Sequence, residues 1–312
     1  MKTLKEFVAY LIISFSIALI FSSYKSPHYQ GKDLESSVIK EITEDLYVIN
    51  YRGANYTIYS CTDGLLVVDT GYPGAAAGID SIIKAEFNKP IKYIVNTHLH
   101  FDHVGGNKIL SADGAVIISH ENTRKRMLKE WKLPEFPGGF KYRTIPPYTK
   151  ESLPKICFSD SINIHFNDEI IKLIHMPEGH SDGDIIVYFQ KANVIHTGDL
   201  FLSNAFPPFE GTIEGYLTGV EKIVSLCDET TIVIPGHGPI SDNEGLIIYR
   251  NILDSGAVRI NQLKSQGKTF EEVMQIAPLE GLLSRKSSIP EVVFTYCVFY
   301  GGLNNLTIEH ND

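Results

Sequence analysis

The chain has 312 residues, of which 43% are hydrophobic and 21% are charged, and its formal net charge at pH 7 is −9. This composition is typical of a globular protein with a real hydrophobic core, and the length fits one large domain or two small ones. The acidic balance argues against nucleic acid as a partner. The one basic run, RKR at 124–126, is expected to lie on a solvated helix face.

The N-terminal segment differs from the rest of the chain. Two lysines precede an apolar run over residues 7–21 that only two serines interrupt. As a helix this run is ~22 Å long at ~1.5 Å per residue, shorter than the ~30 Å hydrocarbon core of a bilayer. We therefore expect an export signal over residues 1–23, a polar linker over 24–37, and a mature chain that is periplasmic or secreted. An uncleaved membrane anchor is the alternative.

Beyond the linker, short β-rich runs alternate with helical patterns in two blocks. Strands are predicted at 46–50, 55–61, 65–71, 91–96, 115–119, 162–166, 170–176, 185–190, 193–197 and 231–235. Helices are predicted at 74–88, 105–111, 121–130, 213–227, 243–266 and 290–300. Thr269 and Glu272 match a capping box at the start of a further helix. Strands in two blocks, each followed by helices, indicate a layered α/β fold.

Residues 131–155 interrupt this pattern. The stretch contains five prolines, the only tryptophan and several other aromatic residues, and it is too long for an ordinary connector. Two interpretations stay open: a surface loop packed on its own side chains, and a lid that faces the substrate.

The cysteines are scattered along the chain. They stand singly at Cys61, Cys157, Cys227 and Cys297, form no CxxC pair and lie away from the histidine-rich motif described next. Single cysteines in apolar runs are more often buried thiols than disulfide partners, so we expect no disulfide.

Residues 98–103 read His-Leu-His-Phe-Asp-His, so four metal-competent side chains occupy six positions. Neutral imidazole and carboxylate groups are the usual nitrogen and oxygen ligands of zinc and similar ions. If the segment is extended, His98, His100 and Asp102 point to one side, because side chains alternate along a strand, and His103 points elsewhere. This arrangement suits two neighbouring metals better than one.

Three more candidate ligands lie just beyond predicted strands. His180 follows the strand at 170–176, Asp199 follows the strand at 193–197, and His237 follows the strand at 231–235. Functional residues of layered α/β folds gather in loops at one end of the sheet, so these three are expected to converge on residues 98–103. The seven residues would then hold two metals and leave room for water at each, as catalytic sites require.

The motifs THLHFDHVGGN, EGHSDGD, TGDLF and PGHG occur complete and in this order. They resemble those of the metallo-β-lactamase fold superfamily of metal-dependent hydrolases, over about residues 38–240. The resemblance implies a four-layer αββα sandwich, with a C-terminal helical extension from about residue 243, in one hydrolase domain over 38–312. It also implies a binuclear site at one edge, usually of zinc. The first metal would be held by His98, His100 and His180, the second by Asp102, His103 and His237, with Asp199 as the bridge.

The implied reaction is hydrolysis of a small molecule by a metal-held hydroxide, since a metal lowers the pKa of its water to ~7. Asp102 would bind metal and could also steer the hydroxide. The bond attacked would be of the ester, lactone, amide or β-lactam type. His103 directly after Asp102 resembles glyoxalase II and one metallo-β-lactamase subclass. Asp199 resembles the bridging aspartate of glyoxalase II and of many general hydrolases, whereas typical metallo-β-lactamases carry Cys or Ser at that position. The longer motif is most similar to that of exported β-lactamase-like hydrolases.

Three alternatives stay open at this point. One is a class B-like β-lactamase acting on antibiotics, and a second is an iron-dependent, oxygen-handling enzyme similar to persulfide dioxygenases. A third is a binding module without catalysis. The ligand types suit zinc, iron and manganese alike. Contact with a membrane is expected only through the N-terminal segment.

The remaining histidines and two acidic residues are expected to have supporting roles. His165, His175 and His196 fall within predicted strands, where core or supporting positions are expected, and His120 ends a strand. Asp69 and Asp184 are expected to orient a ligand histidine or a loop rather than to bind metal.

Overall fold

The computed structural model of the protein describes residues 39–133, 143–283 and 291–304. The predicted export signal over 1–23 and the linker over 24–37 lie outside these residues. Within the described ranges, every helix is too short or too polar to span a bilayer.

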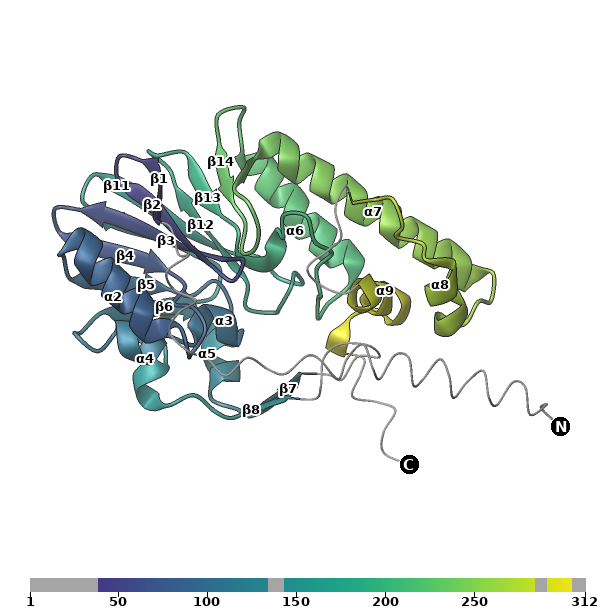
Figure 1. Ribbon diagram of the computed structural model, residues 1–312, viewed down its shortest axis with the longest axis horizontal. Helices are drawn as coiled ribbons and strands as arrows, with labels where there is room; N and C mark the ends of the chain where they lie inside the picture. Colours follow the sequence, from purple (N-terminus) through teal and green to yellow (C-terminus); the bar gives the residue numbers. More distant parts are fainter. Residues whose placement is uncertain (1–38, 134–142, 284–290, 305–312) are drawn as a thin grey trace.

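Two mixed sheets lie face to face (Figure 1). The first contains, in spatial order, β1 (Ile39–Thr43), β2 (Leu46–Tyr51), β3 (Ala54–Cys61), β4 (Gly64–Val68), β5 (Ile91–Val95), β6 (Val116–His120) and β9 (Ile156–Phe158). The first four strands are antiparallel neighbours, and β4, β5, β6 and β9 run parallel. The carboxyl ends of β4, β5 and β6 therefore meet at one edge.

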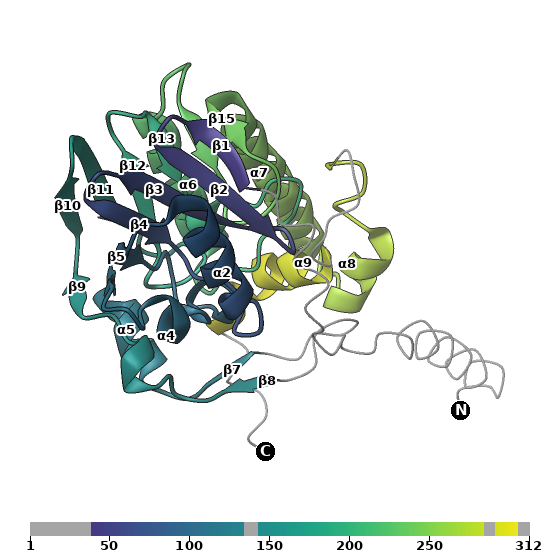
Figure 2. The ribbon, with the colours of Figure 1, turned by 60° about the vertical axis from the view of Figure 1, so that its left-hand side comes forward.

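The second sheet follows in the sequence. Its spatial order is β10 (Ser161–Phe166), β11 (Glu169–His175), β12 (Ile185–Phe189), β13 (Val194–His196), β14 (Ile232–Ile234) and β15 (Ser241–Asp242). Its only parallel pair among the described residues is β13 with β14, because α6 crosses over between them. A small separate hairpin joins β7 (Trp131–Leu133) to β8 (Arg143–Ile145), outside the two sheets (Figure 2).

Helices cover the outer face of each sheet. The first sheet carries α2 (Ala76–Phe87), α3 (Phe101–Val104), α4 (Asn107–Leu110) and α5 (Glu121–Met127). The second carries α6 (Ile213–Leu226), α7 (Asn243–Ser265), α8 (Phe270–Ile276) and α9 (Glu291–Tyr300). Two short 3-10 helices, η2 (Lys150–Ser152) and η3 (Gly198–Leu200), lie in connections.

The hydrophobic residues divide into layers that match this arrangement. Along β4, Leu66 and Val68 pack between the two sheets, whereas Leu65 and Val67 pack against α2 on the outer side. The alternation follows from the two-residue period of a strand, and a strand buried on both faces is apolar throughout. A third cluster joins the second sheet to α6, α7, α8 and α9. The predicted αββα sandwich with C-terminal helices is thus confirmed.

Some local predictions were wrong. Residues 101–104 form the short helix α3 instead of continuing an extended segment, so Asp102 does not share one face of a strand with His98 and His100. The run at 124–126 is not a purely solvated face, because Arg126 is held in ion pairs described below. Strands β1, β7, β8, β9 and β15 had no predicted counterpart. The capping box of Thr269 and Glu272 at α8 is confirmed.

The cysteines are only partly as expected. Cys61 and Cys297 are buried, but Cys157 on β9 is exposed.

The two sheets are tied together at the edge where β4, β5, β13 and β14 end. Ile185 N donates to Thr97 O at 2.9 Å, which joins the start of β12 to the segment after β5. Asn55 on β3 reaches the loop after β14: its backbone N donates to Gly236 O at 2.9 Å, and its side-chain amide donates to Pro235 O at 2.8 Å. Loops from both sheets therefore meet at this edge, and backbone hydrogen bonds fix the distances between these loops.

A candidate binuclear metal centre

The seven candidate ligands come from loops of both sheets. His98 and His100 lie between β5 and α3, and Asp102 and His103 lie on α3 itself. His180 lies between β11 and β12, Asp199 lies on η3 after β13, and His237 follows β14. The structure brings all seven together in two adjoining groups. The convergence expected from the strand ends is therefore observed, although binding of metal by these residues stays a prediction.

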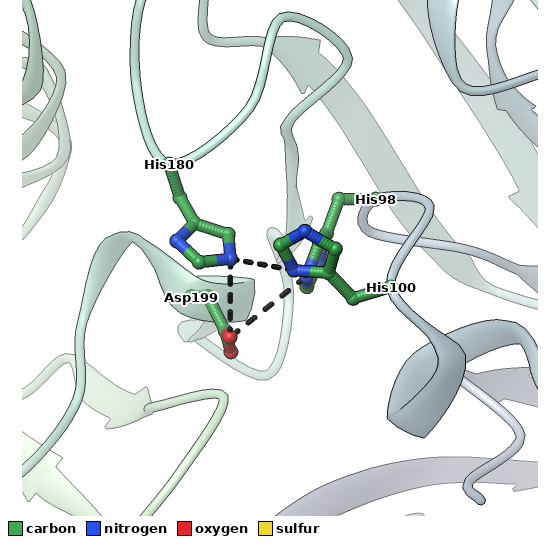
Figure 3. Close-up of side chains that lie close together, drawn as sticks. All are labelled: His98, His100, His180 and Asp199. Carbon is green, nitrogen blue, oxygen red and sulfur yellow. Dashed lines mark hydrogen bonds and ion pairs between the residues drawn. The ribbon is translucent and has the colours of Figure 1, made fainter. Parts of the chain in front are cut away.

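The first group contains His98, His100, His180 and Asp199, whose candidate ligand atoms all lie within 4.8 Å of one another (Figure 3). His100 Nδ1 is 3.0 Å from His98 Nε2 and 2.8 Å from His180 Nε2. Three ring nitrogens thus point at a common centre, which is how zinc sites with three protein nitrogens are built.

The second group contains Asp102, His103 and His237, again with ligand atoms within 4.8 Å of one another. His237 Nε2 is 3.2 Å from Asp102 Oδ2, and His103 Nε2 is 3.7 Å from the same oxygen. This group therefore offers two ring nitrogens and one carboxylate oxygen to one centre.

Asp199 lies between the two groups and presents one oxygen to each. Its Oδ2 is 3.8 Å from His98 Nε2 and 3.5 Å from His180 Nε2. Its Oδ1 is 3.3 Å from His103 Nε2 and 3.6 Å from His237 Nε2. A carboxylate in this position has the geometry of a bridge between two cations.

The hydrogen bonds at the outer nitrogens define which nitrogen of each ring is free to bind. His103 Nδ1 donates to Asp69 Oδ2 at 2.7 Å, and His180 Nδ1 donates to Pro208 O at 2.7 Å. Thr97 Oγ1 donates to Asp69 at 2.7 Å, so it accepts from His98 Nδ1 at 3.0 Å. With the proton on Nδ1, each ring presents the Nε2 lone pair to the centre.

Asp69 is the residue that organises this side of the site. It is fully buried at the end of β4 and adopts a left-handed φ of +62°. Its Oδ1 accepts from Thr97 N at 2.8 Å, and its Oδ2 accepts from Thr97 Oγ1 and from His103. Strained backbone at a buried carboxylate is typical of a functional site. The expectation that Asp69 orients a ligand histidine agrees with this geometry.

The electrostatics are those of a site arranged for cations. Burial, together with neighbouring His103, holds the pKa of His98 well below its usual value, so this ring is neutral. Burial would also lower the pKa of His103, but Asp199 and Asp69 outweigh it and raise that pKa well above normal. Burial would raise the pKa of Asp102, but His103 and His237 lower it to about 2. A divalent cation would take the place of the proton on His103.

Two buried polar atoms of the site, His103 Nε2 and Asp199 Oδ1, lie 3.3 Å apart but are not aligned for a hydrogen bond, and neither has another hydrogen-bond partner among the described residues. Buried polar atoms are nearly always paired, and an orphan points to a missing ion or water. Both atoms face the same space between the two groups, so the donor set fits a metal. The nitrogen and carboxylate ligands suit zinc, iron or manganese.

The approach of the chain to Asp199 requires a glycine. A Cβ at Gly236 would collide with Asp199 Oδ1 and with the backbone of Gly198. Gly236 N instead donates to Gly198 O at 2.8 Å, which holds the loop after β14 against η3. Because glycine permits this close approach, the loop of His237 reaches the loop of Asp199.

Arg126 supports the site in a way that its sequence position did not indicate. On α5, its Nη2 donates to Glu210 Oε1 at 2.7 Å and its Nη1 donates to Asp182 Oδ1 at 2.9 Å. Glu210 N in turn donates to His180 O at 3.1 Å. The guanidinium thus ties α5 to the loop that carries His180. Arg126 has this role only because the fold brings it next to acidic residues that are distant in the sequence.

Aromatic side chains lie next to the candidate ligand histidines. The Trp131 ring stacks on His100 with centroids 5.3 Å apart, and Trp131 and Tyr148 pack on a small cluster that contains Leu99. Phe101, which stands between His100 and Asp102 in the sequence, makes an edge contact with Tyr72, with ring centroids 5.6 Å apart. Trp131 and Tyr148 belong to the segment that the sequence left open as surface loop or lid. Its described part lies against the site.

The other histidines take different places. His196 is fully buried behind the site, where its Nδ1 is 2.8 Å from Thr57 Oγ1, and burial lowers its pKa to about 4. His120 and His175 stack on each other with centroids 3.6 Å apart. His165 is exposed, so its expected core or supporting position was wrong. Asp184 accepts from Ser181 N at 2.9 Å and so shapes the loop after His180, as expected.

Comparison with known proteins identifies the family. The model of the metallo-beta-lactamase superfamily matches residues 50–240, more than half of the chain. The chain belongs to this superfamily, and the predicted assignment to an enzyme superfamily is confirmed. A solved metallo-beta-lactamase from Pontibacter korlensis shares the fold, with a TM-score of 0.54 at 17% identity over 68% of this chain and 95% of that one.

Two curated relatives are similar over part of their length. The beta-lactamase-like protein 2 homolog of Caenorhabditis elegans is 28% identical over 194 residues, which are 61% of this chain and 58% of that protein. A hydroxyacylglutathione hydrolase of Pelagibacter ubique is 32% identical over 163 residues, which are 52% of this chain and 57% of that protein. The chain therefore spans less than two thirds of the length of these relatives.

Proposed function

We propose that this protein is a binuclear metal-dependent hydrolase that cleaves a bond of the ester, lactone, amide or β-lactam type in a small molecule. The observation that carries the proposal is the position of Asp199, with one carboxylate oxygen toward each group of imidazoles. Two cations in one site repel each other strongly unless negative charge lies between them. Zinc is the metal we propose, since three protein ligands of the imidazole and carboxylate type with an open position are typical of catalytic zinc, and iron and manganese accept the same donors.

The chain's own residues have separate tasks in this proposal. Two divalent metals, when bound, supply a nucleophile near neutral pH and positive charge for a developing oxyanion. Asp69 and Pro208 O hold protons on the outer nitrogens of His103 and His180, so that the inner nitrogens can bind. Asp102, partly exposed at the site, would help His103 and His237 to hold the second metal, and it could orient the attacking nucleophile by accepting a hydrogen bond from it.

The surroundings of the site favour a substrate with an apolar group. Two aromatic pairs, Trp131 with Tyr148 and Phe101 with Tyr72, lie next to the candidate ligands. Tyr148 Oη and Trp131 Nε1 are buried and have no hydrogen-bond partner among the described residues, so each could donate to a polar atom of the substrate if its side chain turns toward the bound molecule. Sites for small molecules commonly combine apolar walls with a few such polar atoms.

The test is a panel of chromogenic ester, lactone, thioester and β-lactam substrates against the full chain. We expect hydrolysis of at least one class, loss of that activity on exhaustive chelation and return on addition of zinc or manganese. His100→Ala should lower the rate by orders of magnitude, whereas His165→Ala, an exposed histidine outside the site, should not. Full activity in metal-free protein, or oxygen uptake with an iron-loaded protein in place of hydrolysis, would refute the proposal.

A further inference from the structure

Two buried tyrosines lie directly behind Asp199. Tyr216 on α6 is fully buried, and Tyr249 on α7 is 4% exposed. The Tyr216 hydroxyl is 2.7 Å from the backbone carbonyl oxygen of Asp199, and it is 3.0 Å from the Tyr249 hydroxyl. The Tyr249 ring also packs against Phe201, with centroids 4.8 Å apart. Helices of the outer layer are thus connected to the backbone of the central carboxylate.

The direction of these hydrogen bonds follows from their chemistry. A carbonyl oxygen can only accept, so the Tyr216 O–H must donate to Asp199 O. The single proton of Tyr216 is then used, and the Tyr249 O–H must donate to Tyr216 Oη. Burial raises the pKa of both phenols above the normal value, so both hydroxyls keep their protons. The chain runs in one direction, from Tyr249 through Tyr216 to Asp199.

The backbone around Asp199 needs such support. Gly198 adopts a left-handed φ of +54°, and η3 consists of only three residues. The neighbouring carbonyl of Gly198 accepts from Gly236 N, whereas the carbonyl of Asp199 receives the Tyr216 hydroxyl. A turn this short has few hydrogen bonds of its own. A hydrogen bond to the Asp199 carbonyl therefore fixes the backbone of this residue, and the fixed backbone restricts the direction of the Asp199 side chain.

We propose that Tyr216 and Tyr249 are positioning residues that hold the Asp199 carboxylate between the two metals. Tyr249 lies beyond residues 50–240, the part matched by the superfamily model, so the C-terminal helix α7 contributes to the metal centre. This inference rests on the proposed binuclear site. It predicts a specific pattern of metal affinity when either hydroxyl is removed.

The experiment is a zinc titration in the presence of a competing chelator, on the full chain and on three phenylalanine variants. In Tyr216→Phe the Asp199 carbonyl loses its partner, and we expect the affinity of the more weakly held zinc to fall on the order of tenfold. Tyr249→Phe should have a smaller effect in the same direction. The double variant should be no weaker than Tyr216→Phe alone, because Tyr249 acts through Tyr216. The tighter zinc should be held as in the parent.

Tyr188→Phe is the matched control. Tyr188 on β12 also loses one hydroxyl hydrogen bond, at 3.4 Å to Asn193, but its neighbours are Asp228 and Glu169 rather than the ligands. It should bind both zinc ions as the parent does. Thermal unfolding of the metal-free proteins serves as the second readout, because a purely structural role would lower stability without changing the ratio of the two affinities.

Failure of this inference can be told apart from failure of the proposed function. If the parent binds two zinc ions and Tyr216→Phe binds both equally tightly, the positioning role is wrong and the binuclear site stands. An additive loss in the double variant would contradict the chain from Tyr249 through Tyr216, since it would mean that Tyr249 acts separately, through its hydrogen bond with the Leu202 backbone. If the parent itself binds fewer than two zinc ions, the proposed function is wrong, and this inference fails with it.

Discussion

The candidate ligand histidines depend on the residues that hydrogen-bond their outer nitrogens, and Asp69 is the most connected of these residues. It accepts from His103 and twice from Thr97, which itself contacts His98. An amide at this position could donate from its NH₂ group to His103 Nδ1. The ring would then carry its proton on Nε2, the nitrogen that should bind metal. We expect Asp69→Asn to lower metal affinity or hydrolysis by roughly 10- to 100-fold, the usual cost of losing such a partner.

Competitive zinc titration and initial rates would measure this effect. Asp45→Asn, in the exposed turn before β2, is a suitable control because Asp45 does not contact the site. An Asp69→Asn variant with the affinity and rate of the parent would show that this hydrogen bond does not organise the site.

The stacked pair of His120 and His175 makes a second residue-level prediction. Burial, with the adjacent His175, lowers the pKa of His120 below 6.5 in the folded protein. The unfolded chain therefore binds a proton before the folded one as pH falls, and the stability that this ring contributes above about pH 6.5 is lost on acidification. The side chain of His120→Asn is shorter but can still cap α5. In this variant the free energy of unfolding should fall less steeply as the pH decreases, and the difference in slope should correspond to at most about one bound proton.

Chemical denaturation of parent and variant at several pH values between 7.5 and 5 would provide these slopes. The histidines that do not contact His120 keep the same surroundings in both proteins, so their contributions cancel, and the difference reports the stacked pair of His120 and His175. Identical slopes for the two proteins would mean that His120 titrates in the folded state as it does in the unfolded chain.

At the level of elements, the hairpin of β7 and β8 is the part most directly placed to influence substrate choice. It carries Trp131, whose ring stacks on His100, and it leads to Tyr148. Neither residue belongs to the metal-ligand groups. Trp131→Ala should therefore change relative rates several-fold across a substrate panel, with the largest loss for substrates with bulky apolar groups. Metal content should remain that of the parent.

Elemental analysis beside the rate panel distinguishes the two roles. Phe158→Ala, on the more distant strand β9, removes an aromatic side chain away from His100 and should change all rates alike. Loss of metal in Trp131→Ala, or equal changes across the panel, would contradict a role in substrate choice.

The elements that could be predicted are those whose own periodicity is strong. Long apolar patterns mark helices α6 and α7 and strands β3, β4 and β12. Their predicted ends agree with the structure within one or two residues, except that the strand predicted to end at residue 71 ends at Val68 in β4. Helix α3 has only four residues, and β9 and β15 have three and two, so their local signals are too short. Strands β9 and β15 form because β6 and β14 offer them hydrogen bonds, which only the assembled sheets provide.

At the level of the whole molecule, the site depends on the joining of two sheets. The candidate ligands could be found from the sequence, because each of them follows closely after an apolar strand. The supporting residues could not be found in that way: Arg126 lies in a basic run, and Tyr249 lies in a helix beyond the motifs. Their roles come from long-range contacts, 84 residues apart for Arg126 and Glu210 and 33 for Tyr216 and Tyr249.

The central claim is that Asp199 joins two metal positions into one site. The direct measurement is elemental analysis of the dialysed parent and of Asp199→Ala. The parent should hold about two metals per chain, because the bridging carboxylate offsets the repulsion of cations ~3.5–4 Å apart. Without that carboxylate the variant should fold, retain about one metal on three remaining ligands, and lose most of its hydrolytic rate. If Asp199→Ala holds two metals as tightly as the parent, Asp199 is not a bridge and the binuclear account is wrong.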